Sequence, residues 1–472
     1  MGLVAPVDPV PVGELGRVHF AAIGGAGMSG IARIMLARGV PVSGCDSAHS
    51  PQLEDLSELG AQVSVGHSAA HLSDIDTLVI SSAIRADNAE LVAARQRGIR
   101  VLHRAAALAS LMIGRQGIAI AGTHGKTTVT SMITTVLRRC GADPSYVIGG
   151  TLAETGVGAA EGTGTAFVAE ADESDGSFLM LAPDAAVVTC IEADHLDNYG
   201  SLAEIEHAFA SFASRITAGG LLLTDADDAG ARRLVRAALA SSLPVRLVSY
   251  GESEDADYRV ASVIPIGMTT QFEIAYGGEA VKLEIAVPGR HNAKNAVAAF
   301  ALAVELGFDR DSVLAGLASY RGAMRRMEPK GEVAGVRVLD SYAHHPTELA
   351  VDLAAARDVA VGGRVIAIFQ PHLFSRTRIF AAEFGRALGA ADEVFVLDVY
   401  AAREDPEPGV TGALVAGAVP GGRASFCPDA GAVPAAIADT AKPGDVVLTM
   451  GAGDVTKLGP RIVTALRSRD GE

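Results

Sequence analysis

The sequence predicts an α/β protein made of three domains in series. Short stretches rich in Val, Ile and Ala alternate with stretches rich in Ala, Leu and Arg along the chain, which is typical of parallel sheets covered by helices. Two glycine-rich loops each lie between an apolar strand and a helix. At about 150 residues per domain, a chain of 472 residues divides into three, and we place the domains at 1–115, 116–322 and 323–472.

The first predicted domain begins with a strand at 18–23, directly followed by Gly25-Ala-Gly27-Met-Ser-Gly30. This G-x-G-x-x-G pattern indicates pyrophosphate binding, because the N–H groups at a helix N-terminus attract anions. Asp46 closes the next predicted strand, about 20 residues on. The pattern leaves three hypotheses open: a nicotinamide dinucleotide, another nucleotide diphosphate such as a UDP-sugar, or a tight turn with close helix packing.

The second predicted domain follows a break at 114–117 and begins with a strand at 118–121. Gly122-Thr-His-Gly125-Lys126-Thr127-Thr128 comes next, a shortened form of the phosphate loop. Its backbone N–H groups can surround phosphates, Lys126 supplies a positive charge, and the Thr127 hydroxyl can bind Mg²⁺. A second nucleotide loop in a second domain weakens the hypothesis of a dehydrogenase.

Acidic residues follow the next two apolar strands, at 166–169 and 185–191. The first is followed by Glu170-Ala-Asp172-Glu173-Ser-Asp175 and the second by Glu192-Ala-Asp194-His195. Strand ends next to a phosphate loop would bring Glu173 and His195 near the γ-phosphate, where Mg²⁺ binds carboxylates together with phosphate oxygens. The alternative is that these are solvated loop charges.

The rest of the chain completes the middle domain and forms the third. Strands at 257–264, 269–275 and 280–287, joined by glycine turns, predict a small antiparallel region. A helix at 293–306 ends the middle domain. From Arg337 onward the βα pattern resumes and ends in a strand at 446–449 followed by Gly451-Ala-Gly453.

Composition excludes several classes of protein. The formal net charge is −16, which argues against general nucleic-acid binding, so any site for an anionic substrate must be locally basic. No stretch approaches the ~20 mostly apolar residues of a spanning helix, and residues 1–16 lack the pattern of a signal peptide. The four cysteines lie far apart without a CxxC pair, which predicts buried, reduced thiols in a cytoplasmic protein.

Taken together, these motifs resemble the Mur ligase family, and most closely its alanine-adding members. The resemblance covers essentially the whole chain past Gly16. Besides the two glycine loops and the acidic stretches, it rests on the motifs Ser81-Ser-Ala-Ile84, Pro288-Gly-Arg-His-Asn292, Asp340-Ser-Tyr-Ala-His-His-Pro-Thr-Glu348, Phe369-Gln-Pro-His-Leu-Phe-Ser-Arg-Thr-Arg378 and Gly451-Ala-Gly453.

The resemblance implies a three-domain, cytoplasmic, ATP-dependent ligase of peptidoglycan precursor synthesis. Its N- and C-terminal domains would be Rossmann-like, and its central domain an α/β domain of the P-loop ATPase kind with a small antiparallel region. It would join L-alanine to the lactyl carboxylate of UDP-N-acetylmuramate through an acyl phosphate. The implied cofactors are ATP and two Mg²⁺ ions, for which Mn²⁺ can substitute. Neither nucleic acid nor membrane insertion is expected, and a monomer and a homodimer both remain open.

The resemblance also implies roles for individual residues. The UDP-sugar site would use Gly24, Gly25, Ala26, Gly27, Met28, Ser29, Asp46 and Ser81. ATP would contact Gly122, Thr123, His124, Gly125, Lys126, Thr127, Thr128, His291, Asn292 and Asp340, and the metal ions would bind Thr127, Glu173 and His195. Further residues would reach the phosphates (Arg325, Arg326), face the substrates (His372, Arg376, Arg378) or compete as the base for the alanine amine (His195, His345, His372).

Two departures and three alternatives accompany this interpretation. Many relatives have a second Asp at the position of Ser341, so this chain lacks that charge. Sibling ligases that add later residues carry a carbamylated Lys soon after the metal-binding His, whereas residues 196–216 contain no Lys. The alternatives are a recycling ligase that attaches a whole tripeptide to the same sugar, a dehydrogenase, and a nucleotide-binding regulator without ligase activity.

Overall fold

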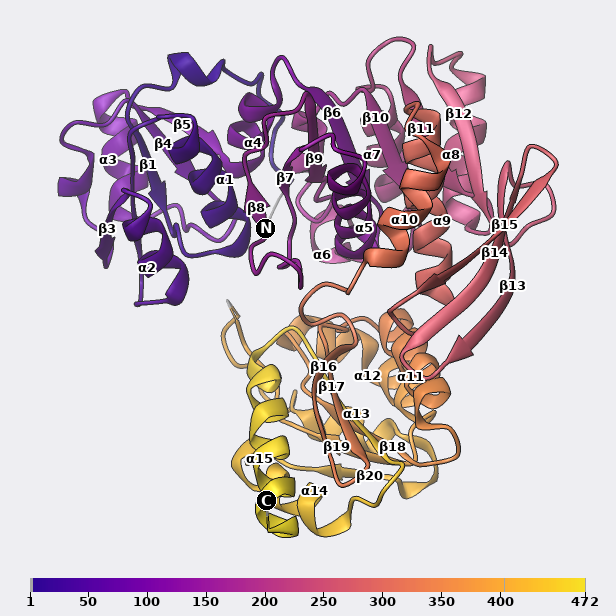
Figure 1. Ribbon diagram of the computed structural model, residues 1–472. Coiled ribbons are helices and arrows are strands. Elements are labelled where there is room, and N and C mark those ends of the chain that lie inside the picture. The colour runs from indigo at the N-terminus through magenta and orange to yellow at the C-terminus, as the bar shows by residue number, and fades with distance from the viewer. Residues whose placement is uncertain (1–2, 403, 472) are drawn as a thin grey trace. The chain divides into compact units, whose positions relative to one another are not determined.

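A computed structural model describes residues 3–402 and 404–471 (Figure 1). The chain forms two compact units. The first comprises Met1–Ala261, Ile274–Val281 and Lys294–Ser319, and the second comprises Ser262–Glu273, Lys282–Ala293 and Tyr320–Glu472. The first two predicted domains therefore lie mostly within one compact unit, and the predicted boundary between them stays a prediction.

The N-terminal sheet is parallel throughout, with the strand order β3-β2-β1-β4-β5. Strand β1 pairs with β2 on one side and β4 on the other, so the loop after it lies at the switch point where open α/β sheets bind ligands. Its elements are β1 (Val18–Ala21), α1 (Ala26–Ala37), β2 (Val42–Asp46), α2 (Pro51–Glu58), β3 (Gln62–Val65), β4 (Thr77–Ile80), α3 (Ala89–Arg97), β5 (Arg100–His103) and α4 (Arg104–Met112).

The central sheet has ten strands in the order β15-β14-β13-β12-β11-β10-β6-β9-β7-β8. Strand β6 lies between β10 and β9 and is parallel to both, so the loops after these three strands emerge side by side. The elements as far as β12 are β6 (Gln116–Ala121), α5 (Lys126–Arg139), β7 (Ser145–Val147), β8 (Ala159–Ala160), β9 (Ala166–Glu170), β10 (Ala185–Val188), α6 (Leu196–Tyr199), α7 (Leu202–Ala213), β11 (Leu221–Asp225), α8 (Ala229–Ala240) and β12 (Arg246–Gly251).

The predicted hairpin region forms the end of this sheet. Its successive strands are neighbours in the sheet and are joined by short turns at 267–268 and 277–278, as the glycines there predict. The strands are β13 (Tyr258–Ile266), β14 (Thr269–Tyr276) and β15 (Glu279–Ile285), and the helices that follow are α9 (Arg290–Glu305) and α10 (Arg310–Ser319).

The C-terminal sheet has the order β16-β17-β21-β18-β19-β20, and all its pairs are parallel except β16 with β17. The carboxyl ends of β17, β21 and β18 are therefore adjacent. The elements are β16 (Glu328–Val333), β17 (Val336–Ser341), α11 (Pro346–Ala360), β18 (Val365–Phe369), α12 (Phe374–Leu388), β19 (Glu393–Val396), α13 (Gly412–Ala418), β20 (Ala424–Phe426), α14 (Val433–Thr440), β21 (Val446–Met450) and α15 (Leu458–Asp470).

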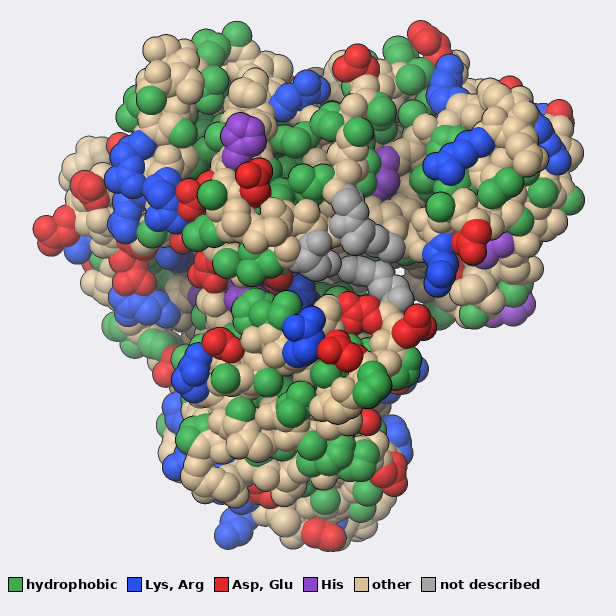
Figure 2. All heavy atoms as spheres, turned by 180° about the vertical axis from the view of Figure 1, so that it is seen from behind, with side chains coloured by type: hydrophobic (Ala, Val, Ile, Leu, Met, Phe, Trp, Pro, Cys, Tyr) green, Lys and Arg blue, Asp and Glu red, His purple; other side chains and the backbone are tan. Residues whose placement is uncertain are grey.

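The surface and the cysteines bear on the expectations from composition. Basic and acidic side chains are intermingled on the face shown in Figure 2. None of the helices within the described ranges is long and apolar enough to cross a membrane.

All four cysteines are free, but only Cys45 is buried, and the other three are partly exposed. The prediction of buried thiols is thus right for Cys45 alone.

Candidate active site

The first glycine loop joins β1 to α1 and is fastened to the end of β2. The Gly24 backbone N–H donates to Asp46 Oδ2 at 3.0 Å. A Cβ at Gly24 would lie 2.8 Å from Leu53 Cδ1 and 2.9 Å from Asp46 Oδ2, so a side chain there would displace both of these side chains. Ala26 to Ser29 form the first turn of α1. Met28 is buried in the core, so its backbone alone can face a ligand.

Arg104 lies beside this loop and was not predicted. A Cβ at Gly27 would be 3.5 Å from Arg104 Nη1, and Arg104 Nη2 donates to the carboxylate of Asp172. Burial raises the pKa of Asp172, but the charges of Arg104 and Lys126 outweigh it and hold the pKa well below its usual range. Arg104 is therefore a local cation near the first loop, as an anionic ligand requires. Ser81 directly follows β4, the strand that pairs with β1.

The second glycine loop joins β6 to α5 in a conformation that requires glycine. Gly122 and Gly125 have φ of +129° and +83°, a region that L-residues seldom adopt. A Cβ at Gly122 would lie 2.0 Å from Thr189 Oγ1. Thr123 Oγ1 accepts a hydrogen bond of 2.9 Å from the Glu192 backbone N–H, which fastens the loop to the segment after β10.

Lys126, Glu173 and His195 meet at the ends of β6, β9 and β10. Lys126 Nζ lies 2.8 Å from Glu173 Oε2 and donates to the Gly122 carbonyl at 2.6 Å. His195 Nε2 is 3.9 Å from Glu173 Oε1. Glu173 is only 2% exposed, and this burial raises its pKa, against the effect of Lys126. Burial lowers the pKa of Lys126, but the charges of Glu173 and Asp172 outweigh it and raise the pKa.

Oxygen donors for a divalent cation gather at the same place. Thr127 Oγ1 is 3.4 Å from Glu170 Oε2, and Glu170 Oε1 accepts a hydrogen bond of 2.7 Å from the Gly149 backbone N–H. With Glu173 beside Lys126, the site offers two carboxylates and a hydroxyl, and these hard donors suit Mg²⁺. The residues therefore fit the predicted cation. Glu170 belonged to the predicted acidic stretch but not to the predicted ligands, because its distance to Thr127 depends on strand order.

In the second compact unit, the fully buried Asp340 pairs with Arg325, whose side chain is 21% exposed. Asp340 has no exposed surface, and its oxygens accept hydrogen bonds from Thr449 Oγ1 at 2.6 Å and Thr456 Oγ1 at 2.7 Å. Arg325 Nε lies 3.4 Å from Asp340 Oδ2. The guanidinium carbons of Arg325 and Arg326 lie 4.8 and 5.5 Å from the centre of the Tyr342 ring. In this structure Asp340 therefore positions Arg325 and does not face solvent.

Ser341 occupies the position at which many relatives have a second Asp, and its partner here is the carboxylate of Asp352. Its hydroxyl donates to Asp352 Oδ2, and His291 Nε2 lies 3.9 Å from Asp352 Oδ1. Burial raises the pKa of Asp352 to about 6. Burial, helped by the charge of Arg326, lowers the pKa of His291 to about 4. Asn292 is buried nearby in the chain, and its Nδ2 donates to the Pro288 carbonyl at 2.7 Å.

The remaining predicted residues of the second unit have varied surroundings. His345 caps α11: its Nδ1 accepts from the Thr347 backbone N–H at 3.4 Å. His372 stacks on Tyr400 with ring centres 5.9 Å apart. The two arginines predicted to face the substrates lie on α12: Arg376 is 9% exposed, and Arg378 pairs with Glu407 at 3.0 Å.

Three protein-family models, each of one Mur ligase domain, match consecutive parts of the chain. They are "Mur ligase family, catalytic domain" at residues 17–116, "Mur ligase middle domain" at residues 120–303, and "Mur ligase, glutamate ligase domain" at residues 325–453.

Similar proteins include relatives matched over almost their full length. UDP-N-acetylmuramate–L-alanine ligase of Thermobifida fusca is 56% identical over 99% of this chain and 100% of its own. The protein of that name from Kineococcus radiotolerans is 56% identical over 97% and 98%. Among solved structures, UDP-N-acetylmuramate-alanine ligase MurC of Thermotoga maritima is 29% identical and covers 96% of this chain and 99% of its own, with a TM-score of 0.82.

Proposed function

The chain belongs to the Mur ligase family, and we propose that it is the member that joins L-alanine to the lactyl carboxylate of UDP-N-acetylmuramate with hydrolysis of ATP to ADP and phosphate. The observation that carries the proposal is the meeting of Lys126, Glu173 and His195 at three adjacent strand ends. The relatives at 56% identity, which bear the name of this activity, support the choice of substrates.

The proposed reaction has two steps. A carboxylate oxygen of the sugar attacks the γ-phosphorus of ATP, ADP leaves, and an acyl phosphate forms. The amine nitrogen of L-alanine then attacks the acyl carbon, and phosphate leaves with the oxygen that attacked it. The first step brings two anions together, so cations near the γ-phosphate are required. Lys126 supplies one, and we propose Arg325 or Arg326 as another.

The ion pair of Lys126 with Glu173 suggests how the site takes up the nucleotide. A phosphate oxygen that arrives at the loop competes with Glu173 for Lys126. The carboxylate so released can then bind a cation. We propose that Thr127 and Glu173 hold one Mg²⁺ ion, with Glu170 beside Thr127, and that His195 contributes to a second. The ions would neutralise charge on the phosphates during transfer.

The other substrates would use the remaining residues. The first glycine loop and Arg104 would hold the diphosphate of the UDP-sugar, since they offer N–H groups and a guanidinium to an anion. Asp340 would act by positioning Arg325 rather than by direct contact with ribose. Arg376 or Arg378 would bind the carboxylate of L-alanine, and His195, His345 or His372 would accept the amine proton. We propose that the protein acts in the cytoplasm, and its free cysteines are in keeping with this proposal.

Release of ADP by the full-length protein tests the proposal. The assay contains MgATP and UDP-N-acetylmuramate with, in turn, L-alanine, glycine, L-serine or the tripeptide of the recycling reaction. We expect fast ADP release with L-alanine and little without an amino acid. Release with the tripeptide alone would indicate a recycling ligase instead. No release with any acceptor, while ATP still binds, would indicate a nucleotide-binding regulator.

A further inference from the structure

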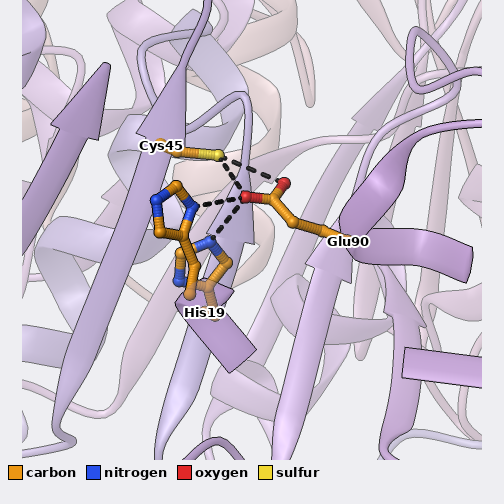
Figure 3. A group of neighbouring side chains, drawn as sticks. His19, Cys45 and Glu90 are labelled. Atoms are coloured by element: carbon orange, nitrogen blue, oxygen red, sulfur yellow. Dashed lines mark hydrogen bonds and ion pairs between the residues drawn. The ribbon is translucent and has the colours of Figure 1, made fainter. Parts of the chain in front are cut away.

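A second cluster of polar side chains lies in the N-terminal sheet, apart from the residues that the proposed reaction uses. It consists of His19 on β1, Cys45 on β2, His71 on the 3₁₀ helix Ala69–Leu72, and Glu90 on α3. Each offers one ligand atom, and these atoms all lie within 4.8 Å of one another. Figure 3 shows His19, Cys45 and Glu90 pointing toward one another. We call this set the His-Cys-Glu cluster.

Glu90 is the centre of the cluster and is fully buried. One of its oxygens, Oε1, lies 2.7 Å from His71 Nδ1 and 3.0 Å from Cys45 Sγ. The other, Oε2, lies 2.9 Å from Nδ1 of His67. Within the described part of the chain, the only basic side chains that pair with Glu90 are histidines. Glu90 is thus surrounded by imidazoles and a thiol, which are the side chains that bind transition-metal ions.

His19 provides an independent sign of a missing ligand. Its ring is 1% exposed, and its Nδ1 is 2.8 Å from Ser43 Oγ. Its buried Nε2 makes no well-formed hydrogen bond, and its partner in the cluster is Glu90 Oε1 at 3.5 Å. A buried polar atom is seldom left in this state, because it has lost its bonds to water. The hydrogen bond to Ser43 orients the ring so that Nε2 faces the cluster, as outer partners of metal-binding histidines do.

We propose that the His-Cys-Glu cluster binds one Zn²⁺ ion through His19 Nε2, Cys45 Sγ, His71 Nδ1 and one oxygen of Glu90. The charges balance: a thiolate and a carboxylate carry two negative charges, the imidazoles are neutral, and the ion carries two positive charges. Thiolate and imidazole favour Zn²⁺ over Mg²⁺, which prefers oxygen. Binding releases the thiol proton to solvent.

The size of the cluster fits a tetrahedral site. With bonds of about 2.1 Å, neighbouring ligand atoms of tetrahedral Zn²⁺ are about 3.4 Å apart. The atoms around Glu90 Oε1 lie 2.7 to 3.5 Å from it, so small outward shifts make room for the ion. His71 offers an entry path, because its side chain is 22% exposed while Glu90 and His19 are buried.

The site would also stabilise the first glycine loop. Cys45 immediately precedes Asp46, whose carboxylate accepts the hydrogen bond from Gly24. The Cys45 carbonyl accepts a second bond, of 2.9 Å, from the Ile23 backbone N–H. The ion would join β1, β2, α3 and the 3₁₀ helix, and would thereby fix the strand ends that carry the loop.

Titration of the metal-free, full-length protein with Co²⁺ tests the proposal, because a cobalt–thiolate bond gives a charge-transfer band in the near ultraviolet. We expect this band to saturate at one equivalent, to disappear when Zn²⁺ is added, and to be absent from Cys45→Ser. The matched control is Cys190→Ser, which removes a thiol beside the phosphate loop and should keep the band. Absence of the band from the unaltered protein, or its persistence in Cys45→Ser, would overturn the proposal.

A second measurement covers the case in which Cys45→Ser does not fold. His71 lies on a partly exposed 3₁₀ helix, so His71→Ala should fold. Zn²⁺ should raise the urea midpoint of unfolding of the unaltered protein, and His71→Ala should weaken Zn²⁺ binding at least about tenfold. Equal affinity and equal stabilisation in both proteins would contradict the assignment of His71 as a ligand and, with it, the site.

Discussion

Replacing Lys126, alone and together with Glu173, distinguishes the contribution of the lysine to catalysis from its contribution to stability. Lys126→Ala removes the cation of the phosphate loop and leaves the carboxylate of Glu173 buried without its partner at 2.8 Å. The double variant Lys126→Ala/Glu173→Gln also removes this charge, since glutamine keeps the shape of the side chain but is neutral. Both variants lack the lysine, and the double variant also lacks a carboxylate proposed to bind Mg²⁺, so both should be inactive while only the single variant retains an unpaired buried charge.

The structure gives the size of each effect. Removing one partner of a buried ion pair costs about 3–5 kcal/mol of the free energy of unfolding. Glu173 can lower this cost by taking up a proton, because burial already raises its pKa. In the double variant no charge is left unpaired, and most of the stability should return. Loss of one donor to the transition state typically lowers turnover by about 10²–10³, and we expect more than a tenfold loss in both variants.

Urea unfolding followed by circular dichroism and ADP release measure the two effects independently. We expect Lys126→Ala to be less stable than the double variant, and both to be folded and nearly inactive. Unchanged phosphate release by Lys126→Ala would refute the role of the lysine in transfer. Equal stability of the two variants would show that the Lys126–Glu173 pair is not the buried ion pair that the structure describes.

Three further predictions concern other parts of the site. Asp352 has a pKa of about 6 in the fold against an ordinary 3.8, so its stabilising effect is complete below pH 3.8 and lost as the pH rises through 6. Asp352→Asn should therefore gain up to about 3 kcal/mol of unfolding free energy at pH 8 and almost nothing near pH 4; a gain independent of pH in urea unfolding would contradict this. Arg376→Lys should raise KM for L-alanine and leave KM for the sugar nucleotide unchanged in steady-state kinetics, and the reverse pattern would exclude the assigned role. Gly122→Ala should lose ATP binding in calorimetry, because its Cβ would lie 2.0 Å from Thr189 Oγ1, whereas normal affinity would show that the loop can move.

Local sequence patterns were sufficient to predict the two glycine loops and the strands before them. Strand β2 ends at Asp46, as predicted, and α5 begins at Lys126 within the second glycine loop. Such features can be predicted because turns that require glycine and the starts of helices depend on residues close together in the chain. Order along the chain also sufficed to predict that Glu173 and His195 lie close together, since both belong to segments that follow strands flanking β6.

Features that depend on packing between distant segments could not be predicted. Arg104 belongs to no motif, and its place beside Gly27 and Asp172 follows from how α4 packs. The contact of Glu170 with Thr127 depends on strand order, and the full burial of Asp340 depends on Thr449 and Thr456 from β21 and the segment after it. The members of the His-Cys-Glu cluster are separated by many residues in the chain and carry no motif spacing, so the fold alone brings them together.

The central claim is that ATP activates the lactyl carboxylate as an acyl phosphate. Tracing a carboxylate oxygen into the released phosphate tests this claim most directly. UDP-N-acetylmuramate labelled with ¹⁸O in its lactyl carboxylate is turned over with MgATP and L-alanine, and the phosphate released is analysed by mass spectrometry. The account predicts that each phosphate carries one oxygen from the carboxylate, because the acyl phosphate breaks between carbon and that oxygen. Unlabelled phosphate, formed together with the alanyl product, would contradict activation of the carboxylate by ATP.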